Sequence, residues 1–215
     1  MNNINLNELR NRAYKTACEH GFHDKELSNE HCLCLIVGAL MKAVEADRKG
    51  RHANVKRYKD MTENSLICKG YNTMIPKEKG FIVAYEDTIK GSVEEELSDA
   101  CIILMDMAGL IDINLSSISF PISNSAEHIN SRKALTFTEW CYDVTRVIAR
   151  YDKNNYPIGY LFVGILQEMC CIAEIIGFDL LWHIEQKMRY NELRPKLNGK
   201  SCLLYTSPSP RDAHE

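Results

Sequence analysis

The sequence lacks the cysteine spacing that marks a structural zinc site or a dithiol redox motif. Its nine cysteines form no C-x-x-C pair. They are scattered over the chain as Cys18, Cys32, Cys34, Cys68, Cys101, Cys141, Cys170, Cys171 and Cys202. We therefore expect reduced thiols, most of them serving as small core residues in a cytoplasmic protein.

The chain also lacks an excess of one charge, a signal sequence and a long apolar run. Lys and Arg number 26 against 29 Asp and Glu, which leaves a net charge of −3 and no basic field for nucleic acid. The N-terminal residues MNNINLNELRNRAYK contain no apolar signal core. The uninterrupted apolar run from Ile158 to Leu166 is far shorter than the ~20 residues that cross a bilayer. We expect a cytoplasmic protein that binds neither nucleic acid nor a membrane.

What the chain does contain is a series of segments with apolar residues at helical spacing. Its 215 residues fit a single domain, and we predict an all-α fold over residues 1–200. Irregular insertions are expected at about 55–90 and 112–134. Besides the two helices described below, the predicted helices are 6–20 with Gly21 as its C-cap, 79–88, 135–150, 157–177 with Pro157 in its first turn, and 179–193 with Asp179 as its N-cap.

The best-marked helix runs from Ser92 to Leu110. Ser92 and Glu95 have the spacing of a capping box, and apolar residues follow at helical spacing. Glu96 and Asp99 lie three residues apart on one flank, roughly 100° from the apolar stripe. Two carboxylates so placed can hold Mg²⁺, although solvated surface acids show the same spacing. The apolar stripe consists of Leu97, Ala100, Cys101, Leu104 and Ala108.

Basic and amide side chains gather near the end of the last predicted helix. Lys187, Asn191 and Arg194 fall at i, i+4 and i+7 and so share one face. Such a face suits the oxygens of a triphosphate. The alternative is a solvated helix end, where the helix dipole favours basic residues.

Two of these segments resemble the motif helices of the MazG-like family of all-α nucleoside triphosphate pyrophosphohydrolases. That family carries E-x-x-E on one helix and E-x-x-D on a later one. Here the first helix lies within Cys32 to Asn54 and the second is the Ser92 helix. The likeness extends over AVEADRKGR, VEEELSDACIILMDMAGL and DLLWHIEQKMRYNELRP, which follow the family order along most of the chain.

The resemblance implies a MazG-like helical bundle that forms a dimer or tetramer. The expected reaction is Mg²⁺-dependent hydrolysis of a nucleoside or deoxynucleoside triphosphate to the monophosphate and pyrophosphate. The resemblance makes Glu96 and Asp99 the catalytic metal ligands. It also implies that the C-terminal run of Lys187, Tyr190, Asn191 and Arg194 contacts the substrate.

The first family motif is disrupted. Ala39 and Lys42 stand where the family has two glutamates, and a lysine repels Mg²⁺ and can itself pair with Glu96 or Asp99. Glu45 lies one turn further on, about 60° round the helix from Lys42, and is an imperfect replacement ligand. The chain is therefore either an impaired pyrophosphohydrolase or a catalytically silent nucleotide-binding or oligomerisation module of the same fold.

A loop from Gly21 to Asp24 is expected to precede the first motif helix. The resemblance makes Phe22 and His23 candidates for contact with the nucleotide base. From the residues alone, packing is favoured for Phe22 and solvent exposure for His23.

The C-terminal segment carries no functional expectation. Cys202 to Asp212, CLLYTSPSPRD, resembles one reading frame of a DNA adapter used to build sequencing libraries. Translated artefacts of this kind are left out of fold reasoning. The Ser/Pro-rich composition predicts a disordered tail over residues 201–215 in either case.

Overall fold

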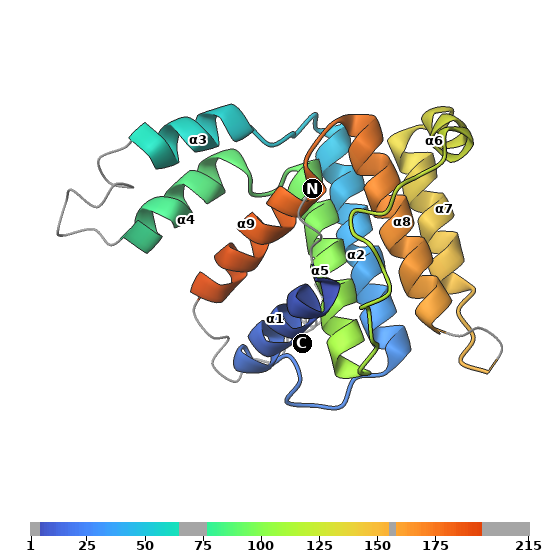
Figure 1. Cartoon of the computed structure of the whole chain (residues 1–215). Coiled ribbons are helices and arrows are strands. Elements are labelled where there is room, and N and C mark those ends of the chain that lie inside the picture. Colours follow the sequence, from blue (N-terminus) through green and yellow to red (C-terminus); the bar gives the residue numbers. More distant parts are fainter. Residues whose placement is uncertain (1–4, 65–76, 155–157, 195–215) are drawn as a thin grey trace, which may run out of the picture.

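A computed structural model of the chain describes residues 5–64, 77–154 and 158–194. Within these residues the protein has nine helices and no strand, which confirms the predicted all-α fold (Figure 1). The adapter-like tail and Pro157 lie outside the described residues. The helices are α1 (Leu6–Glu19), α2 (Asn29–Arg48), α3 (Val55–Asn64), α4 (Lys77–Thr88), α5 (Val93–Leu110), α6 (Ala126–Lys133), α7 (Phe137–Ala149), α8 (Ile158–Ile176) and α9 (Leu180–Leu193).

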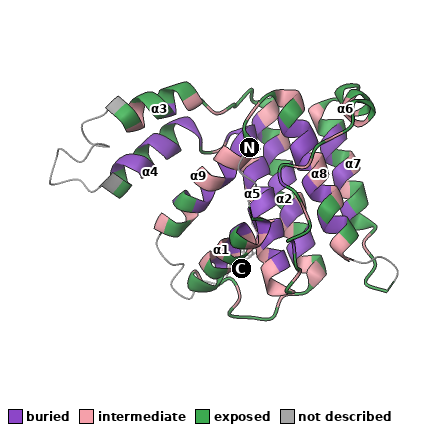
Figure 2. Ribbon diagram, in the orientation of Figure 1, coloured by how far each residue is buried: buried purple, intermediate pink, exposed green. Residues whose placement is uncertain are grey.

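Helix α5 is the centre of the molecule. It packs against α1, α2, α8 and α9, and Figure 2 shows it buried along most of its length. Every residue of its predicted apolar stripe is fully buried. Burial of such a stripe on several sides supplies the main favourable free energy of folding, so the flank of α5 that carries Glu96 and Asp99 has a fixed position.

The N-terminus of α5 is capped by Ser92, although the predicted capping box is only half formed. The Ser92 hydroxyl accepts a hydrogen bond from the Glu95 amide at 3.2 Å. The Glu95 carboxylate does not return to the Ser92 amide, which bonds to the Ile89 carbonyl instead. It accepts from the amide of Gly91, a residue with a φ of +73°. This turn brings the Glu95 side chain inward, which frees its other oxygen for a partner on another helix.

Three helices lie inside the segments expected to be irregular, and one of them, α4, was predicted there as 79–88. Helix α3 lies in the first segment, and α6 lies in the second, where mainly loop was expected. Helix α6 forms because Ser125 caps it through the His128 amide at 3.2 Å. Arg132 near its end then bonds to Glu168 of α8 at 2.7 Å. A local cap and one distant anchor stabilise this short helix, and only the cap is visible in the sequence.

Helices α3 and α4 form a hairpin that projects from the bundle beside α9 (Figure 1). A second hydrophobic cluster joins the hairpin to α9. Within it, the rings of Tyr85 and Tyr190 stack with centroids 4.4 Å apart. The cluster orients α9, and with it the side chains predicted to contact substrate. Its buried members are Tyr58, Phe81, Ala84, Tyr85, Ile89 and Tyr190.

The expectations for the loop after α1 are reversed in the structure. Gly21 adopts a φ of +81° and ends the helix as predicted. Phe22, expected to pack, is 44% exposed. His23, expected to face solvent, has a side chain only 8% exposed and lies 2.7 Å from a carboxylate oxygen of Asp106. The partly buried carboxylate of Asp106 on α5 attracts the imidazole, whereas Phe22 lies at the surface.

One helix of the described residues, α8, is long and apolar enough to cross a membrane. Half of its apolar window is buried inside the protein. It packs against α5, α6, α7 and α9, as a helix in the core of a bundle does.

Candidate functional site

A cavity of about 190 Å³ opens to solvent between the C-terminal half of α2 and the start of α5. We call it the α2–α5 cavity. It brings together three residues singled out in the sequence: Lys42, Glu45 and Glu96. Asp99 does not border it. Among the described residues its lining is Lys42, Glu45, Ala46, Lys49, Arg51, Gly91 and Glu96, which are three cations, two carboxylates, an alanine and a glycine.

Glu96 is the partly buried acid of this cavity. The described part of the chain gives its carboxylate no hydrogen bond and no ion pair. The pKa of Glu96 is raised to about 7, and burial is the largest cause. The negative charges of Glu95 and Asp99 also raise this pKa, and they outweigh the opposing effect of Lys42 and Lys187. The carboxyl of Glu96 therefore changes its charge near neutral pH and is available to a ligand.

Glu45 is committed to neighbours on its own helix. Its carboxylate lies 2.8 Å from the ammonium of Lys49 and 3.8 Å from the guanidinium of Arg48. The hydrogen bond from Lys49 lowers the pKa of Glu45. Glu45, the expected replacement metal ligand, is therefore paired with Lys49 and not placed beside Asp99.

The remaining cations of the cavity have unused donors. Lys42 is exposed and makes no ion pair with any residue that the structure describes. Within the described ranges the Arg51 guanidinium makes one long hydrogen bond, 3.4 Å from its Nη2 to the carbonyl of Lys90. Its guanidinium lies against Gly91, where an added Cβ would be 3.1 Å from Nη2. The absence of a side chain at Gly91 leaves room for the guanidinium at the cavity wall.

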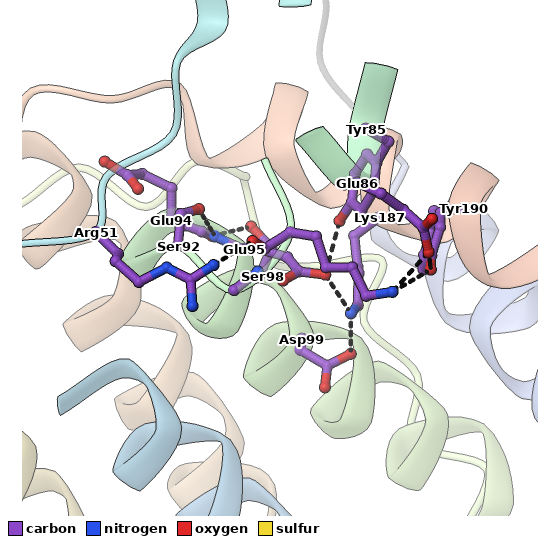
Figure 3. A network of polar contacts seen from close by, with 12 residues as sticks. Arg51, Tyr85, Glu86, Ser92, Glu94, Glu95, Ser98, Asp99, Lys187 and Tyr190 are labelled. Atoms are coloured by element: carbon purple, nitrogen blue, oxygen red, sulfur yellow. Dashed lines mark hydrogen bonds and ion pairs between the residues drawn. The ribbon is translucent and has the colours of Figure 1, made fainter. Parts of the chain in front are cut away.

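A buried ion-pair cluster lies next to the cavity on α5. The Lys187 ammonium is 2.7 Å from Oε1 of Glu95 and 3.5 Å from Oδ1 of Asp99 (Figure 3). The Tyr85 hydroxyl also donates to Oε1 of Glu95, at 3.0 Å. Burial lowers the pKa of Lys187, but Asp99 and Glu95 outweigh it and leave that pKa above its usual value. The partner of Asp99 is therefore Lys187 and not Lys42.

The predicted C-terminal substrate face does not form one surface. Lys187 and Tyr190 are buried, whereas Arg194 is exposed. The Tyr190 hydroxyl bonds to Glu86 at 2.5 Å and accepts from Lys90 at 3.0 Å. The carbonyl oxygen of the Asn191 side chain is buried without a partner among the described residues. Contact of these four residues with a substrate stays a prediction.

The residues at the family metal positions do not fit a four-carboxylate Mg²⁺ site. Ala39 is buried and offers no oxygen, and Lys42 is a cation. Asp99 is paired with an ammonium, and Glu96 is the carboxylate of the set that has no partner in the part of the chain that the structure describes. Across the described ranges no group of three or more His, Cys, Asp or Glu side chains is placed to hold a metal ion.

Sequence reasoning missed Glu95, Lys49, Arg51 and Gly91. The basic run DRKGR at the end of the motif helix was a signal for Lys49 and Arg51. Glu95 was interpreted only as a cap. Its pairing with Lys187 spans 92 residues, and no local pattern marks it.

No family model, curated protein or solved structure matches this chain. The function therefore has to be inferred from the site itself. The MazG-like resemblance remains a hypothesis that rests on the motif residues.

Proposed function

We propose that this protein is a MazG-like module that binds nucleoside triphosphates but has lost the Mg²⁺-dependent pyrophosphohydrolase activity. The position of Lys187 carries the proposal, since its ammonium lies between the carboxylates of Glu95 and Asp99. A fixed positive charge there neutralises an acid that would otherwise face a metal ion.

Lys42 adds a second obstacle to metal binding. It borders the same cavity as Glu96 and lowers the pKa of that carboxyl, so the two side chains interact. Mg²⁺ needs hard oxygen ligands, and two like charges a few ångströms apart repel each other strongly in a partly buried site. Glutamate at this position would attract the ion, and lysine opposes it.

Nucleotide binding is supported by the cations of the α2–α5 cavity. Lys42, Lys49 and Arg51 present donors that suit the acceptor oxygens of phosphate groups. The net charge of −3 makes a nucleic acid a poor alternative ligand. A cytoplasmic location and a homo-oligomer, dimer or tetramer, belong to the same proposal.

A slow pyrophosphohydrolase is the second candidate, favoured by the carboxylate of Glu96, which has no partner among the described residues. Mg²⁺ often binds through one or two carboxylates, waters and the phosphates of the substrate. When bound, the ion supplies charge neutralisation and a water of lowered pKa for attack at the α-phosphorus. Glu96 would hold it, and Asp99 would join only after release from Lys187.

The test is pyrophosphate release from a panel of NTPs and dNTPs with and without Mg²⁺. We expect no release by the full natural chain and Mg²⁺-dependent release by the double variant Ala39→Glu/Lys42→Glu. Adding Glu96→Gln to that double variant should abolish the release. Metal-dependent turnover by the natural chain selects the slow enzyme instead.

Calorimetric titration with ATP completes the test. Binding without turnover supports the proposed module. A natural chain that neither binds nor hydrolyses any nucleotide overturns both candidates. Light scattering on the eluted protein reports the oligomer, and a monomer contradicts that part of the proposal.

A further inference from the structure

We propose that the α2–α5 cavity is a metal-independent binding site for a diphosphate group. The proposal rests on the proposed function only in taking a nucleotide as the carrier of that group. It differs from the family reaction in the source of the positive charge. Lysine and arginine side chains of the protein neutralise the phosphates here, whereas Mg²⁺ does so in the family.

The unused donors of the cavity are the first argument. Lys42 has no ion pair among the described residues, and Arg51 makes a single 3.4 Å hydrogen bond to a carbonyl. Ammonium and guanidinium groups carry donors and no acceptor, so they call for a ligand of acceptor oxygens. A planar guanidinium matches two phosphate oxygens at once.

Lys49 is the third cation, and its existing partner does not remove it from the site. Its pair with Glu45 is formed by side chains that are each more than half exposed. Exposed pairs of this kind contribute only about 0–1 kcal/mol. Glu45 also has Arg48 at 3.8 Å, so Lys49 can turn to a phosphate while Glu45 keeps a partner.

The helix dipole does not account for this arrangement. Basic residues are favoured in the last turn of a helix, and this explains Arg48 and the neighbouring Lys49 at the end of α2. It does not explain Lys42, which lies almost two turns before the end. Arg51 lies beyond the helix and is directed to the same cavity by Gly91.

The size of the cavity sets the class of ligand. Its volume of about 190 Å³ equals roughly six water molecules at ~30 Å³ each. A diphosphate group fits that space, and the opening to solvent lets the rest of a larger ligand extend out of it. A nucleotide would place its phosphates in the cavity and its nucleoside outside.

Glu96 sets the limit on affinity. Its carboxylate borders the cavity together with the cations and has no hydrogen-bonding partner in the described part of the chain. It can accept a hydrogen bond from a protonated phosphate oxygen or a sugar hydroxyl, and it repels a fully ionised phosphate. The site therefore favours a partly protonated or esterified diphosphate over fully ionised pyrophosphate, which is a tetraanion.

The experiment is a calorimetric titration of the full chain with inorganic pyrophosphate in the presence of EDTA. We expect binding without metal, weakened about tenfold by Lys42→Gln and again by Lys49→Gln, because each removes one charge-assisted hydrogen bond. Lys15→Gln is the matched control. Lys15 is an exposed lysine on α1, far along the chain from the cavity, and its loss should leave the affinity unchanged.

Any of three results would contradict the proposed site. These are no pyrophosphate binding in EDTA, pyrophosphate binding that appears only with Mg²⁺, and equal affinity for pyrophosphate in the Lys42→Gln and Lys15→Gln variants. Titration with ATP separates this inference from the proposed function. ATP binding that is insensitive to Lys42→Gln keeps the nucleotide module and removes this site. Pyrophosphate binding without ATP binding keeps the site and removes the module.

Discussion

The ammonium of Lys187 on α9 lies 2.7 Å from a carboxylate oxygen of Glu95 on α5, and both side chains are at most 10% exposed. The second oxygen of Glu95 is occupied by the Gly91 amide, and Tyr85 donates to the first. Burying two charges is costly unless the remaining hydrogen-bonding capacity is satisfied. Here it is satisfied from three elements, so the pair fixes how α9 sits on α5.

Replacing Lys187 should therefore destabilise the protein more than the loss of a surface charge does. We expect Lys187→Met to lower the free energy of unfolding by about 3–5 kcal/mol, because it leaves the Glu95 carboxylate buried without its partner. Urea unfolding followed by circular dichroism measures the change. The double variant Lys187→Met/Glu95→Gln should recover part of the loss, and a single variant within about 1 kcal/mol of the natural protein would falsify the structural role.

His183 on α9 should make stability fall in mild acid. Burial lowers its pKa to about 4, against the opposing effect of Glu94, Asp179 and Glu95. The unfolded chain takes up a proton near pH 6.5, while the folded protein resists until about pH 4. The stability that comes from keeping His183 neutral is therefore fully present above pH 6.5. It is lost as the pH falls toward 4, by about 3 kcal/mol in total.

Comparison with a His183→Phe variant isolates this contribution. The phenyl ring keeps the aromatic contacts with Phe178 and Trp182 and cannot titrate. Its free energy of unfolding should decline less steeply between pH 6.5 and pH 4 than that of the natural protein. Parallel curves over this range would show that His183 is not held neutral.

The helices with strong local signals were predictable from the sequence. Ser92 and Asp179 cap α5 and α9 as expected, and Gly21 ends α1. These features depend on residues within one turn of each other, which a sequence displays directly. The all-α class follows from the same local patterns.

The site was predicted less well, since its decisive contacts are not local. The i, i+4, i+7 spacing placed Lys187 and Arg194 on one face, but α9 crosses α5 and buries Lys187 while Arg194 stays exposed. His23 was misjudged for the same reason, because its partner Asp106 lies 83 residues away. Periodicity identifies a face of a helix, and only the packing shows what covers that face.

Two glycines inside helices should respond to alanine with opposite signs. At Gly38 of α2 an added Cβ meets nothing within 4 Å, so Gly38→Ala should stabilise the protein by about 0.5–1 kcal/mol through helix propensity. At Gly109 of α5 the Cβ would lie 2.5 Å from Cβ of Tyr14. Gly109→Ala should destabilise by about 1–3 kcal/mol, because α1 must move away from α5.

Thermal unfolding of both variants checks the pair. Each substitution places alanine in a helix, so propensity alone predicts the same sign for both. Equal stabilisation would mean that α1 does not approach α5 as closely as the structure shows. A loss at Gly38 would mean that an unseen partner covers that exposed face of α2.

Glu96→Gln distinguishes an anion site from a metal site. In a Mg²⁺-dependent enzyme the substitution removes an oxygen ligand and weakens the binding of metal and substrate. In the proposed anion site it removes a negative charge that faces the phosphates and keeps the shape of the side chain. At pH 8, with EDTA present, we expect pyrophosphate to bind about fivefold more tightly to this variant, which is the size of a screened interaction between neighbouring charges.

Glu127→Gln on α6 is the control. It removes an equal charge from an exposed position outside the cavity and should change the affinity for pyrophosphate little. If Glu96→Gln weakens binding instead, the Glu96 carboxylate accepts a hydrogen bond from the ligand, and the cations of the cavity do not by themselves define the site.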